Sequence, residues 1–86
     1  MKEWYYLETN GVHQKSFYKK AVVFVYENGD KYLRSYDTIV CCIEGGEFKR
    51  KWTGYSATTM NHVNAFRYQE GLEKLYKSDW LKLKVF

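Results

Sequence analysis

The chain has 86 residues, and its 14 Lys and Arg against 10 Asp and Glu give a formal net charge of +4. A chain of this length is expected to form one domain over residues 1–86 and to bury only about 60–65% of its unfolded surface. The mildly positive, interspersed charge excludes an acidic mimic of DNA, which needs a dense negative surface, and it is weaker than that of a basic arm.

Membrane insertion and secretion are not expected. No apolar run approaches the ~18 residues that span a bilayer, and the first ten residues, MKEWYYLETN, lack the apolar stretch of a signal peptide. We therefore expect a cytoplasmic protein with no membrane partner.

The first 52 residues predict an antiparallel meander. Residues 3–9 are rich in aromatic side chains and suit a short strand, whereas residues 10–18 are polar and predict a loop. Two β-rich runs between residues 20 and 36 flank Asn28-Gly29, a pair that tolerates the positive φ angles of a tight hairpin turn. Residues 21–26 are apolar at every position, so we expect this strand to be central and covered on both faces.

Residues 37–52 repeat the hairpin pattern. An apolar run over residues 38–43 is followed by Gly45-Gly46 and by a returning strand over residues 48–52. The alternation of that last strand fits an edge strand with one wet face. Its two faces carry Phe48, Arg50 and Trp52 on one side and Lys49 and Lys51 on the other.

The two cysteines, Cys41 and Cys42, are adjacent in the sequence. Successive side chains of a strand point to opposite faces, so these two thiols are not expected to pair with each other. Two thiols give neither a disulfide framework nor a zinc site, and the two histidines, His13 and His62, do not make a metal site. We expect buried, reduced thiols and no cofactor.

At residue 54 the period changes to that of a helix. Ser56 is a preferred N-cap, Gly71 is a C-terminal stop, and residues 72–80 predict a further helical turn. Residues 81–86 alternate and predict a closing strand. A stripe at helical spacing is expected to lie on the sheet, formed by Met60, Val63 and Phe66. The predicted fold is α+β: an antiparallel sheet of four or five strands (a meander) with one main helix packed on one face.

Three side chains of this helix form a first candidate site. Thr58 and His62 are four residues apart and share a helix face, with Thr59 beside them. Nucleophilic catalysis requires a third group that orients the base, and no carboxylate lies within a turn of His62. We expect that the protein is not an enzyme. These residues have a structural role, or they contact a partner or ligand.

A second candidate site lies in FKRKWTGY, residues 48–55, where basic and aromatic residues interleave. Lysine and arginine can contact phosphates while rings stack on bases, so the segment is similar to a minimal single-stranded nucleic-acid patch. The same residues describe an ordinary amphipathic edge strand. The candidate contacts are Lys49, Arg50, Lys51, Trp52 and Tyr55.

Aromatic residues make up 20% of the chain, nine Tyr, five Phe and three Trp. Because a domain of this size cannot bury all of these aromatic side chains, we expect some of them to lie on the surface. Exposed tyrosine and tryptophan are typical of protein–protein interfaces, where they are enriched in binding hot spots.

The segments SYDTIV (35–40), WTGYSATTMNHVNAFR (52–67) and DWLKL (79–83) carry a resemblance. The chain resembles a family of small uncharacterised bacteriophage and mobile-element proteins with an S-Y-x-T-x-V strand and a Y-S-x-T-T-x-x-H-[IV]-x-x-F helix. The resemblance covers roughly residues 33–86 and implies an accessory protein made by a phage inside a bacterial cell.

With the absence of catalytic equipment, the resemblance favours a non-enzymatic protein that acts by protein–protein binding. A host bacterial protein is the expected partner, and inhibition of a bacterial defence system, as by an anti-CRISPR protein, is one such role. The alternative is a small single-stranded nucleic-acid-binding module. Either function is compatible with a monomer or a homodimer.

Overall fold

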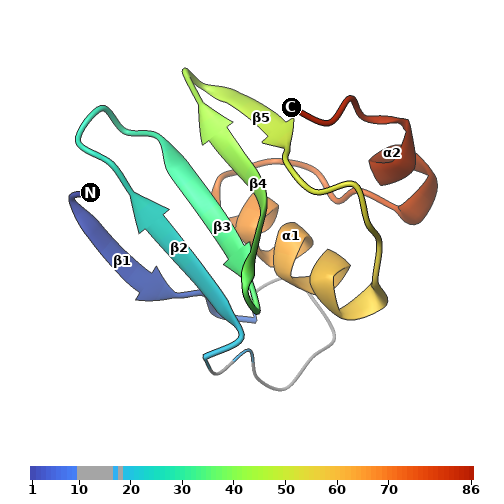
Figure 1. The fold of residues 1–86 in the computed structure, drawn as a ribbon, viewed down its shortest axis with the longest axis horizontal. Helices are drawn as coiled ribbons and strands as arrows, with labels where there is room; N and C mark the ends of the chain where they lie inside the picture. The colour runs from blue at the N-terminus through green and yellow to red at the C-terminus, as the bar shows by residue number, and fades with distance from the viewer. Residues whose placement is uncertain (10–16, 18) are drawn as a thin grey trace.

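Five strands form one antiparallel sheet in the computed structural model, which describes residues 1–9, 17 and 19–86. The strand order β1-β2-β3-β4-β5 follows the chain, and the predicted α+β meander is confirmed. Figure 1 shows α1 against one face of the sheet and α2 beyond β5, beside the C-terminal end. The elements are β1 (Glu3–Tyr6), β2 (Ala21–Val25), β3 (Lys31–Ser35), β4 (Thr38–Glu44), β5 (Glu47–Arg50), α1 (Ala57–Gln69) and α2 (Lys77–Lys82).

The hairpin between β2 and β3 lies where the sequence predicts it, but its turn is wider than predicted. The loop closes with the Tyr26 N–H donating to the Asp30 carbonyl at 2.9 Å and the Gly29 N–H donating to the Tyr26 carbonyl at 2.9 Å. Gly29 has a φ of +92°, whereas Asn28 is not in the positive-φ region. Asn28 instead accepts the Asp30 N–H on its side chain at 3.0 Å, so three residues separate the paired positions.

The inner face of the sheet, defined as the face packed on α1, holds the apolar core. Val23 pairs with Leu33 in the register, and Leu33 pairs with Cys41, so these side chains line up across three strands. All three are fully buried. The predicted helix stripe packs onto them and is confirmed as core, its members being Met60, Val63 and Phe66. Burial of each large apolar side chain contributes about 1.5–3 kcal/mol.

Both predicted ends of α1 are confirmed. Ser56 is the N-cap, and its hydroxyl accepts the Thr59 N–H at 3.0 Å. At the other end Gly71 has a φ of +76°, and the Leu72 N–H donates to the Arg67 carbonyl at 2.8 Å. This six-to-one bond, with a left-handed glycine before it, is the Schellman arrangement that ends many helices.

The predicted closing strand over residues 81–86 is wrong. Residues 81 and 82 belong to α2, and only Val85 forms a β-bridge, a parallel one with Arg50. Asp79 accepts the Tyr76 N–H at 3.1 Å and so stabilises the start of a helix, while Trp80 is fully buried and anchors that helix to the core. A helical turn through residue 82 satisfies both contacts, and the alternation of LKLKV does not follow burial either, because Leu81 is 49% exposed.

Both cysteines are free and buried, as predicted. Cys41 lies on the inner face opposite Arg50, and Cys42 pairs with Tyr32 and Lys49 in the register and lies on the other side. Burial raises the pKa of both thiols, that of Cys41 well above its ordinary value, so neither is a reactive thiolate at neutral pH. The loop predicted for residues 10–18 lies outside the described residues except for Phe17, which is buried in the core.

Candidate functional site

His62 lies in the core between α1 and the sheet. Its Nδ1 is 2.7 Å from the Ser35 hydroxyl, which is also 3.1 Å from the Thr59 hydroxyl. His62 is 0% exposed, and the Phe17 ring packs edge-to-face on it with centroids 4.6 Å apart. Desolvation, helped by the charge of Lys20, lowers the pKa of His62 to about 4, so the ring is neutral at neutral pH.

This Ser35–His62–Thr59 cluster is structural, and the predicted contact role of Thr59 and His62 is wrong. Both residues are buried, so a partner or ligand cannot reach them in this conformation. Among the described residues, His62 hydrogen-bonds to Ser35 through Nδ1 while its Nε2 has no partner, so no carboxylate orients the ring as a base that activates a hydroxyl requires. Thr58, next to them, is half-buried.

Arg50 is also buried, so its predicted role as a surface contact for nucleic acid is wrong. Its guanidinium donates to the carbonyls of Trp52 at 2.8 Å, Thr53 at 2.8 Å and Trp80 at 3.0 Å. The same group lies over the Trp80 ring, 4.7 Å from its centroid. Arg50 therefore fastens the segment before α1 to α2, because a guanidinium presents several donors in a fixed fork.

Trp52 and Tyr55 lie in the segment between β5 and α1. Trp52 packs against the core, and a Cβ at Gly54 would overlap its indole ring, so the chain needs glycine there. Tyr55 is exposed, and Lys77 of α2 lies 4.9 Å from its ring centroid.

Lys49 and Lys51 lie on the opposite face of the sheet. Both ammonium groups approach the same oxygen of Glu44, at 3.5 and 3.6 Å, and the Tyr32 hydroxyl donates to the Glu44 carboxylate. Each lysine side chain is 24% exposed. The eight residues predicted as contacts are therefore distributed over both sides of the sheet and the core, and the structure does not bring them together.

The outer face of the sheet, defined as the face away from α1, carries an aromatic surface that the sequence analysis missed. The register places Trp4 opposite Phe24 and Phe24 opposite Tyr32, while Arg34 pairs with Ile39 of β4. Tyr6 packs edge-on against Trp4 with centroids 5.3 Å apart. We call this set the aromatic face; it comprises Trp4, Tyr6, Phe24, Tyr26, Tyr32, Arg34 and Ile39.

Large apolar side chains on the aromatic face remain open to solvent. Trp4 is 52% exposed and Tyr6 is 42% exposed. They border a cavity of about 250 Å³ together with Val22, Phe24 and Arg34, whose guanidinium lies 5.6 Å from the Phe24 ring centroid. β2 is central and buried on both faces, as predicted: Val23 on the inner face is 0% exposed, and Val22 on the outer face is 2% exposed.

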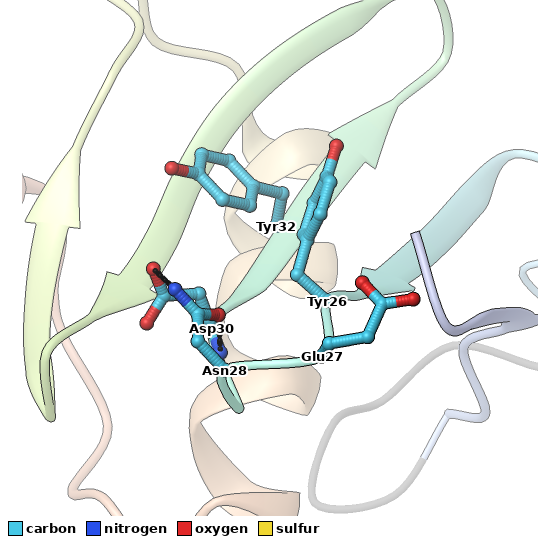
Figure 2. Close-up of a pocket in the computed structure, with 5 residues that line it drawn as sticks. All are labelled: Tyr26, Glu27, Asn28, Asp30 and Tyr32. Atoms are coloured by element: carbon cyan, nitrogen blue, oxygen red, sulfur yellow. Dashed lines mark hydrogen bonds between the residues drawn. The ribbon is translucent and has the colours of Figure 1, made fainter.

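A larger cavity, of about 540 Å³, lies at the β2–β3 hairpin and is shown in Figure 2. The rings of Tyr26 and Tyr32 stand side by side, with centroids 5.4 Å apart and planes at 77°. Glu27 and Asp30 flank them on opposite sides of the hairpin, and Asn28 lies at its tip. The pocket therefore combines two aromatic rings with two carboxylates.

The sequence did contain a signal for the aromatic face. In a strand, alternate residues share a face, so Trp4 and Tyr6 lie on one side of β1 and Phe24 lies on one side of β2. Because Trp4 pairs with Phe24 across the two strands, these side chains form one continuous surface. The all-apolar run of β2 predicts burial on both sides, but it does not show that Trp4 and Tyr6 on the neighbouring strand stay exposed.

Within the described residues, no helix is long and apolar enough to cross a membrane. Among the same residues, no three His, Cys, Asp or Glu side chains are grouped as metal ligands would be. The features that remain are an α+β fold with one helix-covered sheet face and one aromatic face. The protein is therefore a small α+β protein in which one face of the antiparallel sheet is packed on a helix and the other carries solvent-exposed aromatic side chains.

The chain belongs to the family of unknown function DUF8033, whose model matches residues 5–82. That range includes all of β2–β5 and both helices. No curated protein and no solved structure matches the chain.

Proposed function

We propose that this protein acts by binding another protein through the aromatic face of its sheet. The observation that carries the proposal is the exposure of Trp4, Tyr6 and Tyr26 on one side of the sheet, at 52%, 42% and 40%. A chain of 86 residues gains stability by burying such rings. Their position at the surface is accounted for if a partner covers them, since tryptophan and tyrosine are enriched at binding hot spots.

The charges around the aromatic face support a protein partner over nucleic acid. The cationic groups of Lys49 and Lys51 share the single carboxylate of Glu44, which offsets half of their charge, and the hairpin pocket carries Glu27 and Asp30. A phosphate backbone needs unpaired basic groups, which supply most of the affinity of sequence-independent binding. A protein surface tolerates mixed charge, because charge complementarity across an interface governs specificity and association rate.

The resemblance to small phage and mobile-element proteins supports a host bacterial protein as the partner, met in the bacterial cytoplasm. Proteins of a bacterial defence system, such as a CRISPR nuclease, are the class we propose to test first. Expression of the chain in cells with an active defence system is expected to raise the plating efficiency of a targeted phage. Unchanged plating across a panel of defence systems would contradict inhibition of those systems.

The binding proposal itself is tested by affinity capture from bacterial lysate with matched variants. Trp4→Ala and Ile39→Asp alter the aromatic face, whereas Tyr68→Ala removes a ring that is 62% exposed on α1. The expected result is one captured protein, retained after nuclease treatment, kept by Tyr68→Ala and lost with both face variants. Thermal unfolding of each variant confirms that it is folded. Capture that survives both face variants, or that disappears with nuclease, would refute the proposal.

A further inference from the structure

We propose that the pocket at the β2–β3 hairpin, which Tyr26 and Tyr32 help to line, binds a lysine or arginine side chain of the partner protein. This inference rests on the proposed function and adds the chemistry of the group that the partner presents. The five residues that line the pocket are Tyr26, Glu27, Asn28, Asp30 and Tyr32, and its volume is about 540 Å³.

The two rings supply a surface that attracts a cation. Their planes meet at 77° with centroids 5.4 Å apart, so the rings contact each other edge-to-face, and a group in the pocket meets the ring surface that this contact leaves open. An ammonium or guanidinium within about 6 Å of an aromatic centroid gains about 0.5–2 kcal/mol from the ring quadrupole. The methylene stem of lysine or arginine packs on the remaining apolar surface of the ring.

The charges select a cation over an anion or a neutral group. Glu27 and Asp30 are the charged residues that line the pocket, and both are acidic. The Glu27 side chain is 73% exposed, and the amino group of Met1 lies 3.6 Å from its carboxylate. That ammonium group offsets part of the Glu27 charge, so an incoming cation shares this carboxylate with it. An incoming phosphate or carboxylate would meet two negative side chains at once.

Most of the pocket is held in place before any ligand enters. One oxygen of Asp30 accepts the Gly45 N–H at 3.0 Å, and its other oxygen accepts the Asn28 side-chain amide at 3.1 Å. The Tyr32 hydroxyl donates to Glu44, which fixes that ring. Side chains that are already ordered lose little conformational entropy on binding, so a weak cation–π contact is not cancelled by an ordering cost.

The pocket is tested on the full-length protein with N-acetyl-lysine amide as the probe and N-acetyl-norleucine amide as its neutral counterpart. Backbone amide resonances of residues 26–32 are followed by two-dimensional NMR. We expect saturable shifts with the lysine probe in the millimolar range, and affinity at least fivefold lower for norleucine. Glu27→Gln is expected to weaken lysine binding severalfold. Glu47→Gln removes a carboxylate from the other hairpin and is expected to leave binding unchanged.

Equal shifts with lysine and norleucine, or no saturable shift, would overturn the inference. Capture of the partner by variants of the face and of the pocket distinguishes failure of the cation pocket from failure of the proposed function. Loss of capture with Trp4→Ala but full capture with Tyr26→Ala and Glu27→Gln would refute the cation pocket and leave the aromatic face as the binding surface. Full capture with Trp4→Ala would refute the proposed function itself.

Discussion

Replacement of Arg50 by alanine tests whether this residue is a structural clamp or a surface contact. Three short bonds join its guanidinium to the carbonyls of Trp52, Thr53 and Trp80, at 2.8, 2.8 and 3.0 Å. A hydrogen bond to a charged group contributes about 1.5–3 kcal/mol. Because the freed carbonyls regain some contact with water, we expect Arg50→Ala to lower the free energy of unfolding by about 3–5 kcal/mol.

That loss is a large share of the stability of a domain this small, which is about 5–10 kcal/mol. It corresponds to a fall in Tm of about 12–40 °C, at about 4–8 °C per kcal/mol for this chain length. Urea unfolding followed by tryptophan fluorescence measures it, because Trp80 is fully buried in the folded protein and becomes exposed to water on unfolding.

Lys49→Ala is the matched control, since Lys49 precedes Arg50 on β5 and its ion pair with Glu44 is partly exposed. Such pairs contribute about 0–1 kcal/mol. If Arg50→Ala unfolded within about 1 kcal/mol of Lys49→Ala, the clamp would be refuted and Arg50 would again be a candidate for binding.

Three further predictions concern α1. Burial lowers the pKa of His62 to about 4, so as the pH falls the histidine is protonated in the unfolded chain at a higher pH than in the folded protein. The free energy of unfolding should therefore fall by about 1.5 kcal/mol from pH 6.5 to 5, and by less in His62→Gln, as urea midpoints at each pH would measure. Ser56→Ala should cost about 1 kcal/mol through the lost N-cap, read from Tm. Asn64 bonds both backbone groups of Leu75, so Asn64→Ala should cost about 2–3 kcal/mol and speed amide exchange at residue 75, whereas unchanged exchange would contradict that bridge.

Local sequence signals were sufficient for most of the fold because each depends on neighbouring residues. The cap at Ser56, the stop at Gly71 and the stripe through Val63 are set within one or two helical turns, and the structure has all three. The position of the first hairpin follows from Gly29 between two β-rich runs. The length of its loop could not be predicted in this way, because the Asp30 N–H donates to the Asn28 side chain and not to a backbone carbonyl.

The candidate site was harder to predict because it depends on which strands become neighbours. Arg50 alternates with Lys49 and Lys51 in sequence, and that alternation correctly separates the faces. It does not reveal that α2 returns to cover the Arg50 side and provides the Trp80 carbonyl, 30 residues away. His62 likewise gains its partner, Ser35, only when α1 packs on β3.

Site-specific photocrosslinking tests the central claim, that the aromatic face is the surface on which a partner protein binds. A benzoylphenylalanine residue is placed at position 6 on the aromatic face or at position 68 on α1, where the native tyrosines are 42% and 62% exposed. Illumination of expressing bacterial cells is expected to give one crosslinked protein from position 6 and none from position 68. The same product from position 68 alone, or crosslinks to nucleic acid in place of protein, would contradict the account.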